Sequence, residues 1–302
     1  MKELLIIGYG SIGKKKHAYY AKEIGLQPIV LTQYPDNDKK VKFIKDIKEA
    51  ENVEYAIIAT PTNQHLKNFK DLLKNTNCKN VLIEKPISSD YKQAKEILIL
   101  AYKNNINVKV AYCLRFINAI TKLKCLINEN YNEIRLVNIT AGQYLPDWRP
   151  GTDYRKCYSA HKTKGGGVHL DLSHELDYAF YIFGYPLKVL STIKNKISSL
   201  EINSIDYYQT NYKYESFIMN IQLDYFRKSK RVIEVIGEND NIVYLDFVNS
   251  IFRYKNEDIQ EEDLFDIPNN YKLQLEDFLI NSKKSKLATL EESIKIMEYL
   301  EN

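Results

Sequence analysis

The chain has 302 residues, of which 44% are hydrophobic, and its formal net charge at pH 7 is +4. This length fits one large or two modest globular domains, the dispersed lysines argue against a nucleic-acid-binding protein, and no apolar run approaches the roughly 18 residues that cross a membrane. The four cysteines show neither metal-site spacing nor a disulfide framework, which predicts a cytoplasmic protein with reduced thiols and no metal site.

The first motif is a glycine-rich loop that follows a short apolar run. Residues 4–7 are all apolar and predict a buried strand, which leads directly into Gly8-x-Gly10-x-x-Gly13. A helix is expected over residues 12–24, with its free N–H groups and positive dipole end directed at phosphates. A phosphate-loop pattern this close to the first residue also argues against a signal peptide. The pattern predicts dinucleotide binding by the loop residues Gly8, Gly10, Ser11, Ile12 and Gly13.

Alternation of strand and helix patterns continues to residue 112. Strands are expected at 28–32, 53–60, 80–83 and 108–112, with helices between them, and this order predicts a doubly wound parallel sheet. The second strand ends in Thr32-Gln33. At this place many Rossmann folds carry an Asp or Glu that binds the adenosine ribose, and neither residue is an acid. The choice between NAD and NADP therefore stays open.

Two further motifs follow strand ends. One is the segment Thr60-Pro61-Thr62-Asn63-Gln64-His65, in which His65 is either a cofactor contact or simply an early residue of the next helix. The other is Glu84-Lys85-Pro86, which places Lys85 at the carboxyl edge of the sheet, where parallel sheets bind ligands.

The pattern changes after residue 116. Segments at 134–141, 187–197, 205–213, 215–226, 230–237 and 242–248 predict a largely antiparallel sheet of about five or six strands. Helices are expected over 168–183, 270–281 and 289–300. The sequence thus predicts an α/β protein with a Rossmann domain over 1–116 and a substrate-binding α+β domain over 117–302.

An aromatic and charged loop lies in this second domain. Arginine suits bidentate contacts to carboxylate or phosphate, and aromatic faces suit sugar rings, so the loop could clamp an anionic sugar. Alternatively, Arg149 and Arg155 pair with Asp147 and Asp153 inside a folded loop. The candidate substrate contacts in and near this loop are Tyr144, Trp148, Arg149, Tyr154, Arg155 and Tyr158.

The residues after Gly165-Gly166-Gly167 suggest acid–base chemistry. His174 could act as a base toward a substrate hydroxyl, and Lys85 could stabilise the developing alkoxide. Asp171 lies three residues before His174, so on one continuous helix the two would share a face and Asp171 could orient the imidazole or a substrate hydroxyl. Alternatively, Asp171 only completes the helix N-terminus and His174 packs against Tyr178.

Together these motifs resemble the Gfo/Idh/MocA (glucose–fructose oxidoreductase / inositol dehydrogenase) family over nearly the whole chain. The resemblance implies NAD(P)-dependent oxidation or reduction of a sugar or polyol, and a C-terminal sheet that mediates homo-oligomerisation as a dimer or tetramer. Many family members separate the Asp and the His by four residues rather than three, which weakens the role of Asp171. By the same resemblance, the expected cofactor contacts beyond the glycine loop are Thr60, Pro61, Asn63, His65, Glu84, Lys85 and Arg115.

The loop over 144–155, with Tyr158-Ser159-Ala160, looks like a bacterial subgroup associated with surface-sugar biosynthesis. The substrate would then be a sugar, a nucleotide-sugar or a sugar acid. An alternative is a regulator that binds the cofactor without turnover, although a retired site has no need to keep both Lys85 and His174.

Overall fold

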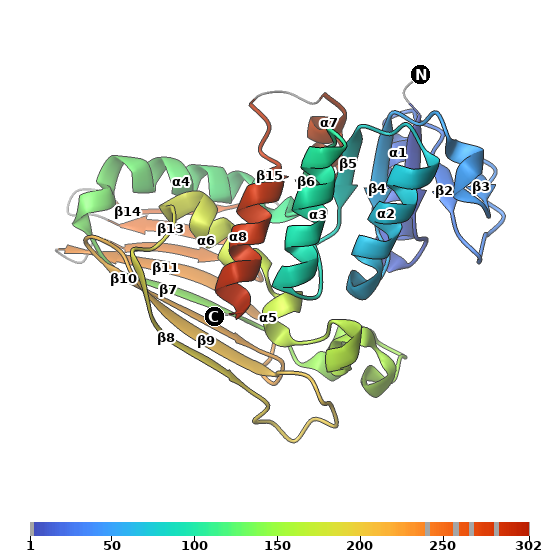
Figure 1. Ribbon diagram of the computed structural model, residues 1–302. Helices are drawn as coiled ribbons and strands as arrows, with labels where there is room; N and C mark the ends of the chain where they lie inside the picture. Colours follow the sequence, from blue (N-terminus) through green and yellow to red (C-terminus); the bar gives the residue numbers. More distant parts are fainter. Residues whose placement is uncertain (1–2, 239–241, 256–259, 266–268, 281–283, 302) are drawn as a thin grey trace. The chain divides into compact units, whose positions relative to one another are not determined.

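The chain forms two compact units. The computed structural model describes residues 3–238, 242–255, 260–265, 269–280 and 284–301 (Figure 1). The first unit combines residues 1–116 with 269–301, and the second unit contains residues 117–268.

A seven-stranded sheet forms the centre of the first unit, in the order β15-β6-β5-β4-β1-β2-β3. Strands β1 to β6 are parallel, which confirms the predicted doubly wound sheet, and the strand order reverses between β1 and β4. A ligand-binding crevice is expected at that reversal. The strands are β1 (Leu4–Ile7), β2 (Ile29–Leu31), β3 (Lys42–Ile44), β4 (Tyr55–Ile58), β5 (Asn80–Ile83), β6 (Asn107–Val110) and β15 (Ala288–Thr289).

Helices pack against this sheet through their buried apolar side chains. In α2, for example, Phe69 and Leu72 are buried. The helices of the first unit are η1 (Gly13–Ala18, a π-helix), α1 (Tyr19–Glu23), α2 (His65–Asn75), α3 (Tyr91–Lys103), α7 (Asn270–Ile280) and α8 (Leu290–Glu301), with short 3₁₀ turns η2 (Ile47–Ala50), η3 (Thr62–Gln64) and η4 (Cys113–Phe116).

The C-terminal segment belongs to the first unit, not to the second as the sequence analysis predicted. Strand β15 pairs antiparallel with β6, with Ala288 opposite Val110. Helix α8 lies beside α3, as Figure 1 shows. The misassignment arose because this two-residue strand gives no hydrophobic pattern of its own.

The second unit contains an eight-stranded sheet, in the order β14-β13-β12-β11-β7-β10-β9-β8. Among the strands that the structure describes, only β7 and β10 pair in parallel, so the prediction of a largely antiparallel sheet is confirmed. The strands are β7 (Ile134–Gly142), β8 (Lys188–Asn195), β9 (Tyr207–Lys213), β10 (Ile218–Asp224), β11 (Lys230–Gly237), β12 (Ile242–Asp246), β13 (Ile251–Lys255) and β14 (Gln260–Leu264).

The predicted strand number was too low because β13 and β14 do not have an apolar pattern. Edge strand β14 includes Glu262, which pairs with Arg253 of β13 through its exposed side chain. Charged edge strands are common because they resist further strand pairing.

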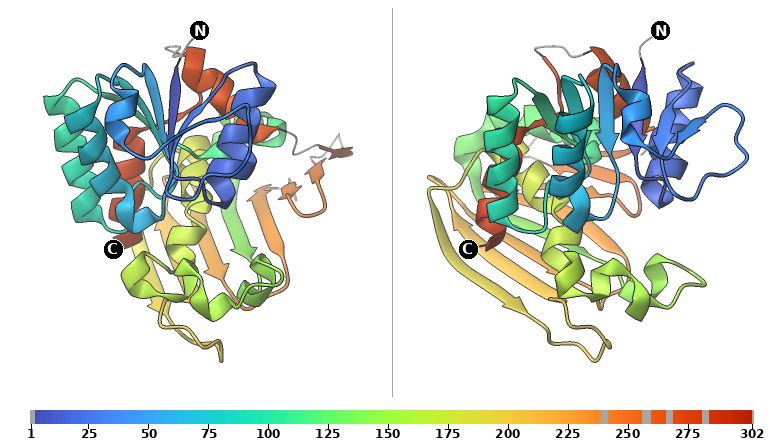
Figure 2. Two further views of the ribbon diagram at one scale, coloured as in Figure 1. Left: turned by 90° about the vertical axis from the view of Figure 1, so that its right-hand side faces the viewer. Right: turned by 45° about the vertical axis from the view of Figure 1, so that its right-hand side comes forward.

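The helices of the second unit lie on one side of its curved sheet, as Figure 2 shows for α5 and α6. Helix α6 packs on the sheet through ring contacts such as Phe180 with Tyr212, whose centroids are 5.8 Å apart. The helices are α4 (Asn118–Asn130), α5 (Val168–Asp171) and α6 (His174–Phe183), with short 3₁₀ turns η5 (Tyr131–Glu133), η6 (Leu145–Trp148), η7 (Tyr154–Lys156), η8 (Tyr158–Ala160) and η9 (Lys162–Lys164).

His169 on α5 gives this unit a predicted pH dependence. Its ring stacks on Tyr208 with centroids 6.0 Å apart, and burial lowers its pKa to about 4. Because unfolded histidine titrates near 6.5, the unfolded chain binds more protons between these two values. Stability should therefore fall as pH drops, and the His169 contribution at about pH 5 should be on the order of 2 kcal/mol. Urea unfolding of wild type and His169→Phe at about pH 7 and pH 5 tests this, and equal losses in both proteins would contradict it.

Candidate cofactor and substrate sites

The glycine loop after β1 is shaped for close approach of a ligand. Gly8 has a φ of +102°, and a Cβ there would lie 2.8 Å from the Ala59 carbonyl oxygen. A Cβ on Gly13 would lie 2.2 Å from the Gly8 carbonyl oxygen, whereas a Cβ on Gly10 would meet nothing within 4 Å. Ser11 and Ile12 are exposed at the start of the helix. The loop is therefore closed at its two ends and open at Gly10, which fits a dinucleotide pyrophosphate.

A cavity of about 340 Å³ lies beside the carboxyl ends of β1 and β2. This volume is within the usual range for small-molecule sites. Its lining residues, most of which the sequence analysis did not single out, are Ile7, Leu31, Gln33, Lys45, Asp46, Ile47, Asn68, Asp71 and Asn75.

Asp36, which follows β2, is engaged by two side chains of the first unit. It accepts a hydrogen bond from the Tyr9 hydroxyl at 3.1 Å and pairs with Lys14 at 2.8 Å. The hydrogen bond from Lys14 lowers the pKa of Asp36, while burial and the hydrogen bond to Asp36 raise the pKa of Tyr9 to about 12. This carboxylate supplies the anion that offsets the cation Lys14 near the helix N-terminus.

His17 and Glu84 form a buried contact that the sequence analysis missed. The regular helix predicted over 12–24 is instead a π-helix over Gly13–Ala18, and π-bulges are frequent at functional sites. Nε2 of His17 lies 2.7 Å from Oε1 of Glu84, and His17 is 1% exposed. The contact joins the helix after the glycine loop to the strand end that carries Lys85.

Replacing His17 with phenylalanine should destabilise the first unit. The change would leave the Glu84 carboxylate buried without this partner, which typically costs about 1–3 kcal/mol or more. His17→Gln keeps a donor and should cost less. The free energies of unfolding in urea measure both effects, and a His17→Phe protein as stable as wild type would show that the contact contributes nothing.

His65 holds two loops at the carboxyl edge of the sheet. Its Nε2 lies 2.9 Å from the Thr60 carbonyl oxygen, and its Nδ1 lies 3.1 Å from that of Pro86. The ring is 1% exposed, and burial lowers its pKa. These contacts favour a structural role, while Pro61 and Asn63 are exposed nearby. Direct cofactor contact by these residues stays a prediction.

Lys85 follows β5 and is half-buried. Its backbone N–H donates to Glu84 at 3.2 Å. Arg115, another expected cofactor contact, is 3% exposed and lies 3.1 Å from Glu292 of α8. Glu292 is 177 positions away in sequence, so no local pattern signals this pair.

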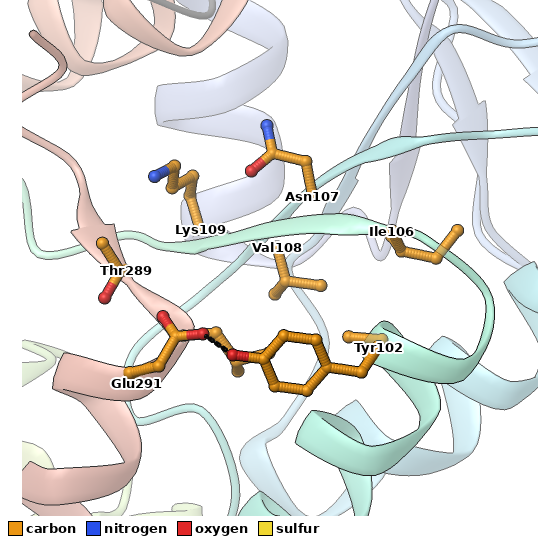
Figure 3. A pocket seen from close by; sticks show the side chains of 9 residues that line it. Tyr102, Ile106, Asn107, Val108, Lys109, Thr289 and Glu291 are labelled. Atoms are coloured by element: carbon orange, nitrogen blue, oxygen red, sulfur yellow. Dashed lines mark hydrogen bonds between the residues drawn. The ribbon is translucent and has the colours of Figure 1, made fainter. Parts of the chain in front are cut away.

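A smaller cavity, of about 140 Å³, lies along β6 and β15 (Figure 3). Tyr102 and Glu291 close one side of it through a 2.5 Å hydrogen bond. It is lined by Asn107, the first residue of β6. It is therefore not at the carboxyl edge of the sheet, where the glycine loop and Lys85 lie.

In the second unit, Asp171 is the centre of a buried hydrogen-bond network. The Tyr158 hydroxyl donates to its Oδ1 at 2.7 Å, and the Tyr225 hydroxyl donates to its Oδ2 at 2.6 Å. Asp171 is 4% exposed. Tyr225 was missed because it follows β10, 54 positions away, with no motif around it.

Asp171 and His174 were predicted to share one face of a continuous helix, and this prediction is wrong. Helix α5 ends at Asp171 and α6 begins at His174, with Leu172 outside α geometry at φ −100° and ψ 33°. His174 is 7% exposed in the first turn of α6.

The two arginines of the aromatic loop make different contacts. Arg155 pairs with Asp153 at 2.9 Å and with Glu201 at 3.1 Å, as the structural alternative anticipated for Asp153. The guanidinium of Arg149 instead lies over the Tyr158 ring, 5.2 Å from its centroid. Of the other candidates, Tyr144 is 41% exposed, and the Tyr154 hydroxyl accepts a hydrogen bond from the Glu201 N–H.

The described helices include none with the length and apolar character needed to span a membrane. The same part of the chain contains no group of three or more His, Cys, Asp or Glu side chains arranged to hold a metal ion.

Residues 2–112 match the family model GFO_IDH_MocA, described as an oxidoreductase family with an NAD-binding Rossmann fold. An uncharacterized oxidoreductase from Streptococcus pneumoniae is 26% identical over 188 residues, which are 59% of this chain and 49% of that protein. The match thus spans about half the length of that relative.

Two solved structures show the same fold over nearly the full chain. Aldose-aldose oxidoreductase from Caulobacter crescentus superimposes with a TM-score of 0.81 at 15% identity, covering 99% of this chain and 95% of that one. A super-repressor mutant of Gal80p from Saccharomyces cerevisiae has a TM-score of 0.82 at 14% identity, covering 99% and 94%.

Proposed function

We propose that the chain, whose residues 2–112 match the GFO_IDH_MocA family model, is an oxidoreductase of that family and transfers a hydride between NAD or NADP and a hydroxyl or keto carbon of a sugar, a nucleotide-sugar or a sugar acid. The observation that carries the proposal is the open backbone at Gly10 in a loop closed on both sides. That loop and Lys85 both follow carboxyl ends of strands in the same parallel sheet.

Two parts of the first unit would bind different parts of the dinucleotide. The N–H groups from Gly10 to Gly13 would receive the pyrophosphate, and the cavity beside Gln33 would receive the adenosine end. Asp36 is already engaged by Tyr9 and Lys14, and the choice between NAD and NADP stays open. When bound, the nicotinamide supplies the hydride acceptor or donor.

We assign the proton chemistry to three side chains. His174 takes the hydroxyl proton of the sugar, because an imidazole nitrogen can accept a proton and histidine is a common general base. Lys85 stabilises the negative charge that develops on the reacting oxygen. Asp171 acts through Tyr158 and Tyr225, not by proton transfer, because each of its oxygens already accepts a phenolic hydrogen bond.

We also propose a role in bacterial surface-glycan biosynthesis, in the cytoplasm. The support is the resemblance of the loop over 144–155 to that subgroup.

Self-association through the second sheet is part of the same proposal, because edge strand β8 exposes Leu190 and Ile193, which are 47% and 43% exposed. Light scattering of the purified protein measures the oligomeric state.

The experiment that tests the proposal is a turnover screen. Purified protein is mixed with NAD or NADP and with panels of neutral sugars, uronic acids and nucleotide-sugars, while the absorbance of reduced nicotinamide is followed. We expect turnover with a member of these panels and its loss in Lys85→Ala. Absence of turnover in every combination, in protein that binds the dinucleotide, would contradict the proposal.

That negative outcome would favour the second candidate, a cofactor-binding regulator without turnover. The observation in its favour is the fold similarity to the Gal80p super-repressor mutant, which shows that this fold is not confined to proteins named as oxidoreductases.

A further inference from the structure

We propose that Arg149 binds an anionic group of the substrate, a carboxylate or a phosphate, and that Tyr225 is a positioning residue for this contact. The inference rests on the proposed function, because it names the chemical class of the sugar. Every residue that carries it belongs to the second unit.

Of the two loop arginines, Arg155 is already neutralised. Its Nε and NH2 groups donate to the two oxygens of Asp153, and NH1 donates to Glu201 at 3.1 Å. The hydrogen bond from Arg155 in turn lowers the pKa of Asp153. An anionic ligand would have to displace two carboxylates to reach this guanidinium, so Arg155 is a loop-forming residue.

Arg149 is held differently. Its guanidinium lies over the Tyr158 ring, 5.2 Å from the centroid, and its side chain is half-buried. Among the described residues no carboxylate lies within ion-pair distance of it. Stacking on a ring leaves the in-plane N–H fork of arginine able to donate, and that fork matches a carboxylate or a phosphate.

The ring beneath Arg149 is fixed by a buried acceptor. The Tyr158 hydroxyl donates to Oδ1 of Asp171 at 2.7 Å, and the Tyr225 hydroxyl donates to Oδ2 at 2.6 Å. Burial, reinforced by the Asp171 charge, raises the pKa of both phenols well above the usual value. Both tyrosines therefore stay protonated donors at physiological pH, and the carboxylate stays anchored between them.

Tyr225 also sets the start of the loop that carries Arg149. Its ring meets the Trp148 ring edge-on, with centroids 5.3 Å apart and an interplanar angle of 89°. Its backbone carbonyl accepts from the Leu145 N–H at 2.9 Å, and Trp148 Nε1 donates to the Gln143 carbonyl at 3.1 Å. One fully buried tyrosine thus positions both the residue next to Arg149 and, through Asp171, the ring on which Arg149 lies.

Three sugars that share a ring type and differ in charge test the proposal: glucuronate, glucose 1-phosphate and glucose. Calorimetry on the full chain gives each affinity, and the emission of Trp148, the single tryptophan of the chain, reports whether binding occurs beside Arg149. We expect at least one of the two anions to bind at least about 10-fold more tightly than glucose and to change the emission. Binding of only one anion would support the proposal and identify the source of the charge.

Matched variants distinguish Arg149 from Arg155, and anion binding by Arg149 from positioning by Tyr225. Arg149→Lys should weaken anion binding by about 10-fold or more, because the charge persists but the fork is lost, while Arg155→Lys should leave it within about 2-fold. Tyr225→Phe should weaken it by about 5-fold, from loss of one hydrogen bond. Tyr178→Phe is its control, because the buried Tyr178 hydroxyl has no hydrogen-bond partner among the described residues.

The proposal is overturned if neither anion binds at about 20 mM, or if Arg149→Lys keeps wild-type affinity. A merely structural Tyr225 would lower the melting temperature of Tyr225→Phe while leaving anion affinity in the folded protein unchanged, and that result would overturn its assignment. The assay requires no turnover. An enzyme that oxidises neutral sugars without binding anions would refute this inference alone, whereas anion binding without turnover would refute only the proposed reaction.

Discussion

Gly10→Val is expected to reduce dinucleotide affinity by about 100-fold or more while leaving the first unit folded. A valine side chain at this position meets no protein atom within 4 Å of its Cβ, so the change costs the unliganded fold little. The same side chain would fill the space through which the backbone approaches a pyrophosphate. A 100-fold loss corresponds to roughly 2.7 kcal/mol of binding free energy. Titration with NADH and with NADPH, followed by fluorescence, measures it.

The contrast with Gly13 provides the control. A Cβ on Gly13 would lie 2.2 Å from the Gly8 carbonyl oxygen, so Gly13→Ala should disturb the loop itself and lower the melting temperature. Gly10→Val should not lower it. A folded Gly10→Val protein with wild-type dinucleotide affinity would refute binding at this loop.

Lys85→Ala and His174→Ala should each lower turnover by about 10²- to 10⁴-fold, the usual contribution of general acid–base or charge-stabilising groups. Dinucleotide affinity should stay near wild type in both variants, because neither side chain is proposed to hold the phosphates. Steady-state kinetics on the substrate found in the screen, with NADH titrations alongside, separates the two quantities.

The double variant tests whether the two side chains assist the same step. Groups that act on one proton are not additive, so the combined loss should be smaller than the product of the single losses. Fully multiplicative losses would indicate that Lys85 and His174 act independently, and unchanged turnover in either single variant would remove that residue from the mechanism.

Local sequence was sufficient to predict the Rossmann sheet. The apolar runs of β1 and β4 are continuous and fully buried, and Gly8 and Gly13 stand where backbone crowding requires glycine. Strand β14 was not predicted, because its charged sequence QEEDL matches no buried-strand pattern. Strand β15 has only two residues, and its place beside β6 depends on a pairing across about 180 positions.

The candidate site was predictable only where a motif is local. Lys85 and His174 were identified from chemistry and spacing, whereas the Tyr225 contact to Asp171 and the His17 contact to Glu84 join residues 54 and 67 positions apart. The break between Asp171 and His174 was missed because the sequence over 168–183 is apolar enough for one continuous helix.

The most direct test of the central claim is the fate of the hydrogen on the reacting carbon. The sugar identified in the screen is labelled with deuterium at the carbon that is oxidised, and the reduced nicotinamide formed from NAD or NADP is examined by mass spectrometry. The proposed reaction predicts that one deuterium appears in the nicotinamide for each sugar oxidised, and that Gly10→Val slows the transfer at dinucleotide concentrations that do not saturate the variant. Oxidised sugar with no deuterium in the nicotinamide, or no oxidation of any sugar by protein that binds the dinucleotide, would contradict it.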